Sequence, residues 1–163
     1  MLTLTFALKF AHIIVMAVML GTWLGIALFM LFAHRSGKTP VDKAPVVALI
    51  SVFVVRAEMW VMAGAVVLQP ITGFLLALAY DAPVSAYWIE ASAAIYAAVV
   101  LAWICCLLIE MRIRRLSRGA ALATAPLPRS YRGLFWAWSL FTVVGLGGMV
   151  AITALMVWRP EWS

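Results

Sequence analysis

Four apolar stretches, each long enough to cross a lipid bilayer, occupy most of this chain of 163 residues. A hydrocarbon core of about 30 Å takes roughly 20 helical residues, and the candidate spans are 4–32, 46–79, 86–109 and 134–158. Backbone amides in lipid need partners inside the protein, so each stretch is expected to be a helix, and the alternating pattern of a membrane barrel is absent from the sequence. We therefore predict an all-α polytopic membrane protein, with one antiparallel bundle of four transmembrane helices over 1–163.

The composition agrees with a membrane environment. Hydrophobic residues make up 67% and charged residues 11% of the chain, and the mean hydropathy is +1.10. A water-soluble domain has far fewer apolar residues, so a soluble fold is excluded. The first apolar stretch is longer than the roughly 7–15 residues of a secretory signal and follows no basic segment, so we expect the protein to retain it.

Lysine and arginine gather in the first and third connections, while the turn at 80–85 has none. By the positive-inside rule, these two connections lie in the cytoplasm and both termini are periplasmic, in a bacterial inner membrane. Nine of the twelve basic residues lie in these connections: Arg35, Lys38, Lys43, Arg112, Arg114, Arg115, Arg118, Arg129 and Arg132.

The net charge of +6 does not indicate nucleic-acid binding. In a membrane protein, basic residues set the topology and meet anionic lipid headgroups, and no nucleic-acid recognition module accompanies them here. The lipid bilayer is the expected partner. Cys105 and Cys106 are adjacent, a spacing that matches no metal or redox motif, so we interpret them as buried structural thiols.

His12 is the most informative polar residue of the first span. It lies about 12 Å along the helix from Leu4, within the outer leaflet, where ionisable side chains are rare and face protein. Two roles are open for it, a ligand or a hydrogen-bonded core residue. The same helix face carries Lys9, Met16, Met19 and Trp23, and its Met and Trp side chains are expected to pack in the core rather than to line a cofactor site.

Counting along antiparallel helices brings several polar or ligating groups to the depth of His12: Gln69, Pro70, Ser92, Tyr96 and Met149. Lys9 and Glu90 lie nearer the surface, so we expect an ion pair between them, with a proton relay as the alternative. Pro70 predicts a kink whose freed carbonyl group needs another partner.

Arg56 and Glu58 fall within the long second stretch. We favour a crossing that starts near Trp60, which would place both residues at the inner headgroup level. His34 is 22 residues from His12, or about 33 Å along a helix, so the two histidines cannot share one metal ion. His34 is interpreted as a solvated interfacial residue.

Glycines also recur within the spans, at Gly21 and Gly25 in the first and at Gly145, Gly147 and Gly148 in the fourth. Small residues allow helix backbones to approach closely. Close helix packing and room for a flat cofactor are both open interpretations.

Several segments together resemble the bacterial membrane family called domain of unknown function 2269. They are Leu8-Lys9-Phe10-Ala11-His12-Ile13, Leu68-Gln69-Pro70-Ile71-Thr72-Gly73, Tyr131-Arg132-Gly133-Leu134-Phe135 and Met156-Val157-Trp158-Arg159-Pro160. The resemblance covers almost the whole chain, and the Gln-Pro-aliphatic-Thr-Gly segment is its most specific part. It implies four transmembrane helices and supplies no reaction.

The first helix alone, through Lys9-Phe10-Ala11-His12-Ile13, Trp23 and Gly25, also resembles HemJ-type protoporphyrinogen oxidases and, more loosely, CopD-like copper proteins. The HemJ resemblance implies haem b, with His12 as a candidate axial ligand. Met149 is then the best second ligand in the chain, since His/Met ligation of haem is known. A five-coordinate haem, or a ligand from another subunit, is also open.

Three functions follow as hypotheses. The first is a haem-dependent membrane oxidoreductase that exchanges electrons with quinone or porphyrinogen. The second is a non-catalytic accessory subunit of a larger membrane complex, whose glycine faces dock onto partner helices. The third is a small-solute transporter, for which a homo-oligomer would be needed to build a pathway of useful width.

Overall fold

The computed structural model describes residues 2–37, 39–83 and 85–158, and it contains helices and no strand in these ranges. The prediction of an all-α fold is confirmed. The helical elements are α1 (Leu2–Arg35), α2 (Pro40–Ala57), the π-helical turn η1 (Glu58–Met62), α3 (Ala63–Ala79), α4 (Tyr87–Leu122) and α5 (Arg129–Trp158).

Four helical spans are long and apolar enough to cross a membrane: Thr3–Arg35, Pro40–Ala79, Tyr87–Leu122 and Arg129–Trp158. The second span joins α2, η1 and α3 end to end. These helices extend beyond the apolar stretches of the sequence. The 36 residues of α4 would measure about 54 Å, well over the thickness of a hydrocarbon core.

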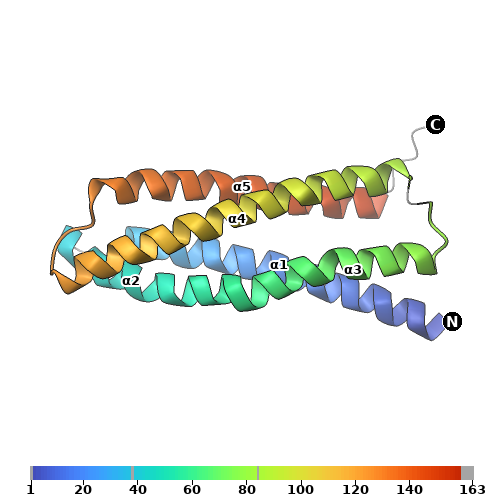
Figure 1. The fold of residues 1–163 in the computed structure, drawn as a ribbon, viewed down its shortest axis with the longest axis horizontal. Coiled ribbons are helices and arrows are strands. Elements are labelled where there is room, and N and C mark those ends of the chain that lie inside the picture. Colours follow the sequence, from blue (N-terminus) through green and yellow to red (C-terminus); the bar gives the residue numbers. More distant parts are fainter. Residues whose placement is uncertain (1, 38, 84, 159–163) are drawn as a thin grey trace.

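The helices lie side by side along one long axis (Figure 1). The α1–α2 and α4–α5 connections lie at one end of the bundle, and the α3–α4 connection lies at the other end with the start of α1 and the end of α5. α4 packs along α5 and α2, and α1 packs against α2 and α3. The predicted antiparallel bundle is therefore present.

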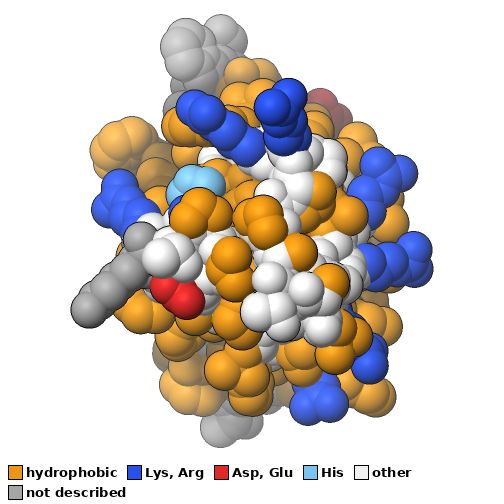
Figure 2. Space-filling model, turned by 90° about the vertical axis from the view of Figure 1, so that its left-hand side faces the viewer, with side chains coloured by type: hydrophobic (Ala, Val, Ile, Leu, Met, Phe, Trp, Pro, Cys, Tyr) orange, Lys and Arg blue, Asp and Glu red, His pale blue; other side chains and the backbone are white. Residues whose placement is uncertain are grey.

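Basic side chains ring the end of the bundle that carries the α1–α2 and α4–α5 connections (Figure 2). We call this end the basic end. The sequence already predicts that the two basic connections share one face of the membrane, and the helix arrangement brings them together. Lys38, one of the nine basic residues of these connections, lies outside the described residues.

Large buried side chains fill the core, among them Trp23 and Met149. A Cβ atom at Gly145 would overlap the ring of Trp23, and one at Gly148 would lie 2.5 Å from Val99 Cγ2. These two glycines therefore serve close packing inside the chain. The interpretation in which they leave room for a flat cofactor, or dock onto a partner helix, is wrong, because Trp23 and Val99 fill the space beside them.

Pro70 lies within α3 and has no backbone N–H group, so the carbonyl oxygen of Val66 lacks its helical donor. The hydroxyl group of Tyr96 donates a hydrogen bond of 2.6 Å to that oxygen. The partner that the sequence analysis requires for the freed carbonyl thus comes from α4. The hydrophobic pattern of the sequence, by contrast, does not predict the π-helical turn.

Candidate functional site

Two regions of the bundle bring buried polar groups together. The first surrounds His12, whose ring lies between α1 and α3. Its Nδ1 is 2.9 Å from Thr72 Oγ1, and its Nε2 is 3.2 Å from Gln69 Nε2. The Thr72 hydroxyl donates to the Leu68 carbonyl oxygen, and its oxygen accepts from Nδ1–H of His12. The Gln69 amide then donates to Nε2, an arrangement that suits a neutral imidazole.

Gly73 completes the contact between these helices. A Cβ atom there would lie 3.1 Å from His12 Cε1, so glycine allows the imidazole to lie against α3. The two sequence segments that contain His12 and the Gln-Pro-Ile-Thr-Gly motif thus meet in space.

The other residues expected at the depth of His12 supply none of the hydrogen bonds of its ring within the described part of the chain. Tyr96 bonds to Val66, and Met149 is buried in the core. Lys9 and Glu90 are both exposed, and no ion pair joins them in the part of the chain that the structure describes. The expected Lys9–Glu90 pair is therefore not formed, because α1 packs on α2 and α3 rather than along α4.

Haem ligation by His12 would have to replace one of the two hydrogen bonds of its ring. Of the glycines near Met149, Gly145 and Gly148 face filled space, as described above, whereas a Cβ atom at Gly147 would meet nothing within 4 Å. Haem ligation by His12 and Met149 stays a prediction.

The second region contains two carboxyl groups, those of Glu58 and Glu110, each with 0% exposure. Glu58 begins the π-helical turn η1, and Glu110 lies on α4. Burial distinguishes the two charged residues of this stretch: Arg56 is exposed, whereas Glu58 turns into the bundle. Their position at the inner headgroup level stays a prediction.

Each carboxyl group accepts one indole N–H hydrogen bond. Trp103 donates to Glu58 Oε2, and Trp138 donates to Glu110 Oε1 at 2.7 Å. The second oxygen of each group, Oε1 of Glu58 and Oε2 of Glu110, is buried with no hydrogen-bond partner among the described residues. The two groups are close enough for their charges to interact.

Helix periodicity explains how α4 and α5 supply these groups. Trp103, Cys106 and Glu110 share one face of α4, at positions i, i+3 and i+7. Cys106 Sγ lies 3.6 Å from Thr142 Oγ1, and Thr142 follows Trp138 by one helical turn of α5. We call these six residues the carboxyl cluster: Glu58, Trp103, Cys106, Glu110, Trp138 and Thr142.

Comparison with known proteins places the chain in a family. Residues 6–160 match the family described as "Predicted integral membrane protein (DUF2269)". The chain belongs to the DUF2269 family. No curated protein and no solved structure gives a match.

The sequence analysis missed most of the carboxyl cluster of this DUF2269 protein. Glu110 directly follows the third apolar stretch, and its helical spacing from Cys106 and Trp103 is the signal that could have found it. Trp136 and Trp138 are only two residues apart in the sequence. In the structure Trp136 is 62% exposed, whereas Trp138 is 3% exposed.

Two further residues of the DUF2269 protein bear on the sequence interpretation. Cys106 is buried, as expected of a structural thiol, and Cys105 is half-buried. His34 is not a simple solvated residue. Its ring stacks on Phe135 with centroids 3.8 Å apart.

Proposed function

We propose that this protein binds and releases protons at the carboxyl cluster and that this proton exchange is coupled to transport of a small solute across the membrane. The observation that carries the proposal is the pair Glu58 and Glu110, both fully buried, each with one oxygen that has no partner. Neither forms an ion pair with a Lys or Arg within residues 2–37, 39–83 and 85–158.

Electrostatics favours a proton on this buried pair. An isolated carboxylate is very unfavourable away from water, and two neighbouring carboxylates also repel each other. One proton on the pair removes the repulsion and the cost of one buried charge, and a second proton removes the cost of the other. Ionisable groups inside membrane segments are rare, and they commonly mark proton relays or substrate pathways.

The indole groups of Trp103 and Trp138 would fix one oxygen of each carboxyl group and leave the other for the proton. Each carboxyl group would then take up or release a proton at its second oxygen, which has no hydrogen-bond partner. Proton uptake or loss would therefore change the contact between α4 and the second span. That change would act on η1, because Glu58 is the first residue of this π-helical turn. π-Helical turns are frequent at functional sites.

We also propose the orientation of the protein. The basic end would face the cytoplasm of a bacterial inner membrane, and both termini would be periplasmic. A chain of four spans leaves little room for a solute pathway, so a homo-oligomer or a larger membrane complex would complete it. The glycines on open faces, Gly21 and Gly25, offer a surface for such contacts.

The redox hypothesis, the first of the three that the sequence raises, has haem b held by His12 and quinone as electron partner. Its remaining support is the resemblance of the first helix, and the ring of His12 already has two hydrogen-bond partners. In the accessory-subunit hypothesis, Gly145 cannot serve as a docking residue, because the Trp23 ring of the same chain packs against it. Proton-coupled transport makes use of the buried carboxyl pair, which neither of these hypotheses explains.

Carbodiimide labelling tests the proton-binding role. Dicyclohexylcarbodiimide reacts with protonated carboxyl groups in apolar surroundings, and mass spectrometry locates the adduct. We expect labelling at Glu58 or Glu110 that decreases as pH rises, and no labelling at the exposed Asp42, which caps α2. Absence of label from both buried glutamates at every pH would contradict the proposal.

Proton movement is measured in proteoliposomes that contain a pH-sensitive dye. An imposed pH gradient should dissipate faster with the wild-type protein than with Glu110→Gln, which keeps the size of the side chain and removes the titrating group. Glu90→Gln is the matched control, because Glu90 lies on the same helix and is exposed. Equal rates for the wild type and Glu110→Gln would contradict the proposal, because proton movement would then not depend on the Glu110 carboxyl group.

A further inference from the structure

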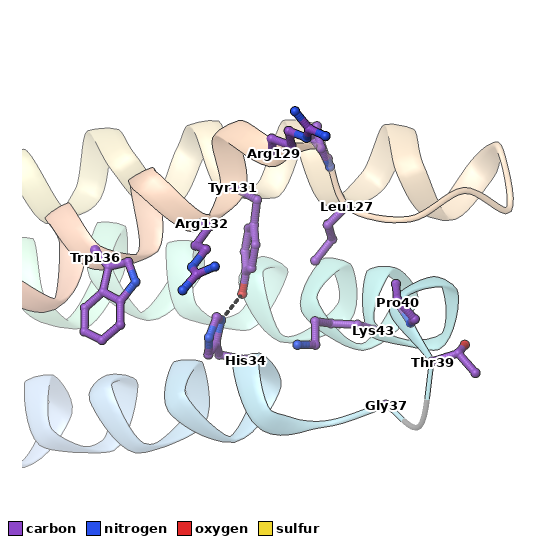
Figure 3. A pocket seen from close by; sticks show the side chains of 11 residues that line it. His34, Gly37, Thr39, Pro40, Lys43, Leu127, Arg129, Tyr131, Arg132 and Trp136 are labelled. Carbon is purple, nitrogen blue, oxygen red and sulfur yellow. Dashed lines mark hydrogen bonds between the residues drawn. The ribbon is translucent and has the colours of Figure 1, made fainter.

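A second site lies at the basic end, apart from the carboxyl cluster. A pocket of about 540 Å³ opens between the start of α5 and the α1–α2 connection. Its wall includes His34, Gly37, Lys43, Tyr131, Arg132 and Trp136 (Figure 3). Nothing in the proposed proton exchange uses these residues.

Two cations from different helices converge on this pocket. The side chains of Lys43 on α2 and Arg132 on α5 both extend toward His34 (Figure 3). Their charges are close enough to act on the His34 ring. Neither cation forms an ion pair with a carboxylate in the described parts of the chain, since the nearby Asp42 caps α2 through Thr39. The positive charge is therefore available to a ligand.

Aromatic packing holds His34 and Tyr131, two residues of the pocket wall. His34 stacks on Phe135 with an interplanar angle of 9°, and its Nδ1 lies 3.2 Å from the Tyr131 hydroxyl group. Tyr131 is 4% exposed, so this hydroxyl group has a fixed position. The pocket thus has a preformed polar floor.

The α1–α2 connection closes against the pocket through a tight turn. Gly37 has φ +88°, and a Cβ atom there would lie 2.8 Å from the Lys43 backbone nitrogen. Glycine is needed on both grounds. The turn therefore places the start of α2, and with it Lys43, directly at the pocket.

We propose that this pocket binds a phosphate group, and that the phosphate belongs to the headgroup of an anionic phospholipid. The planar fork of an arginine matches phosphate oxygens in pairs, and a lysine adds a point charge. The first turn of α5 also lines the pocket through Arg129, and free N–H groups at a helix start favour anions.

Trp136 indicates the lipid source of the phosphate. It lies one helical turn beyond Arg132 and is 62% exposed, and exposed tryptophans concentrate at the headgroup level of membranes. Basic pockets between transmembrane helices are known sites for anionic headgroups. A phosphate seated at Arg132 would thus lie beside an indole ring that contacts the lipid.

Native mass spectrometry of the full chain, delipidated in neutral detergent, tests the proposal. Phosphatidylglycerol is the lipid probe, and inorganic phosphate and glycerol 3-phosphate are the soluble probes. We expect the wild-type protein to bind the lipid. The affinity of the double variant Lys43→Ala/Arg132→Ala for the lipid should be lower by a factor of about ten or more. The control is Arg115→Ala/Arg118→Ala, which removes the same charge from exposed residues of α4 outside the pocket.

Each result has a defined meaning. An equal loss in the control variant would overturn the proposal, because binding would then follow surface charge. Failure of the wild type to bind any probe would also overturn it. Binding of the soluble phosphates at the affinity of the lipid would overturn the lipid source and assign the site to a soluble phosphate compound. A variant that keeps the wild-type thermal midpoint shows that a loss of binding is not a loss of folding.

Discussion

The hydroxyl group of Tyr96 donates a 2.6 Å hydrogen bond to the carbonyl oxygen of Val66, the acceptor that Pro70 leaves without a helical donor. The bond links α4 to α3, two helices that otherwise pack mainly on α5 and α1. Proline within a membrane helix is tolerated when a neighbouring helix satisfies the freed backbone group. Here a single phenol does so.

Tyr96→Phe should therefore destabilise the bundle. We expect a loss of about 1 kcal/mol in the free energy of unfolding, measured by titration with sodium dodecyl sulfate. In a Pro70→Ala background the loss should shrink, because the backbone N–H restored at position 70 can bond to Val66. Tyr80→Phe, at an exposed tyrosine, is the control. The same loss in both backgrounds would show that the hydroxyl group acts elsewhere.

The second prediction concerns the hydrogen bond that the Trp138 indole donates to Glu110. Trp138→Phe leaves a buried carboxyl oxygen without its donor and should lower the free energy of unfolding by about 1–3 kcal/mol. Trp136→Phe makes the same chemical change at a 62% exposed position and should have little effect. Replacing Glu110 by leucine in the Trp138→Phe background should recover part of the loss, since no orphaned oxygen remains. No recovery would argue that packing of the indole, not its N–H, is what matters.

Gly145 provides a test of the core. Gly145→Ala should cost about 1–3 kcal/mol of stability, because the new methyl group overlaps the Trp23 ring. Gly147→Ala is the matched control two residues away, where a Cβ atom meets nothing within 4 Å. Thermal unfolding in detergent, followed by circular dichroism, compares the two. A greater loss at Gly147 would contradict the described packing.

The haem hypothesis has its own decisive measurement. It predicts that detergent-purified protein shows a Soret band, that His12→Ala removes this band and that His34→Ala retains it. A dithionite-reduced minus oxidised spectrum reads the result, and a pyridine haemochrome assay gives the stoichiometry. A preparation that stays colourless after haem is supplied during expression would contradict the hypothesis. The two hydrogen bonds of His12 would then be structural, and His12→Ala should loosen the contact between α1 and α3.

The carboxyl cluster shows where reasoning from the sequence fails. Glu58 follows Arg56 by two residues in an apolar stretch, and a regular helix directs such residues to different faces. The sequence could not tell which of the two turns inward. The π-helical turn that begins at Glu58 and the position of Trp103 on α4 decide it.

The sequence by itself determined the membrane environment, the number of spans and the end of the bundle that carries the basic residues. These features depend on summed hydrophobicity and on charge in the connections, which need no knowledge of contacts. Only the tertiary structure decided that the carboxyl groups of Glu58 and Glu110 are buried close to each other. It also decided that His12 bonds to Gln69 and that the Trp23 ring packs against Gly145. The physical reason is that a helix surrounded by lipid carries apolar side chains on every face, both toward lipid and toward other helices. The hydrophobic pattern therefore does not mark the inward face, and only the packing of helices against one another defines it.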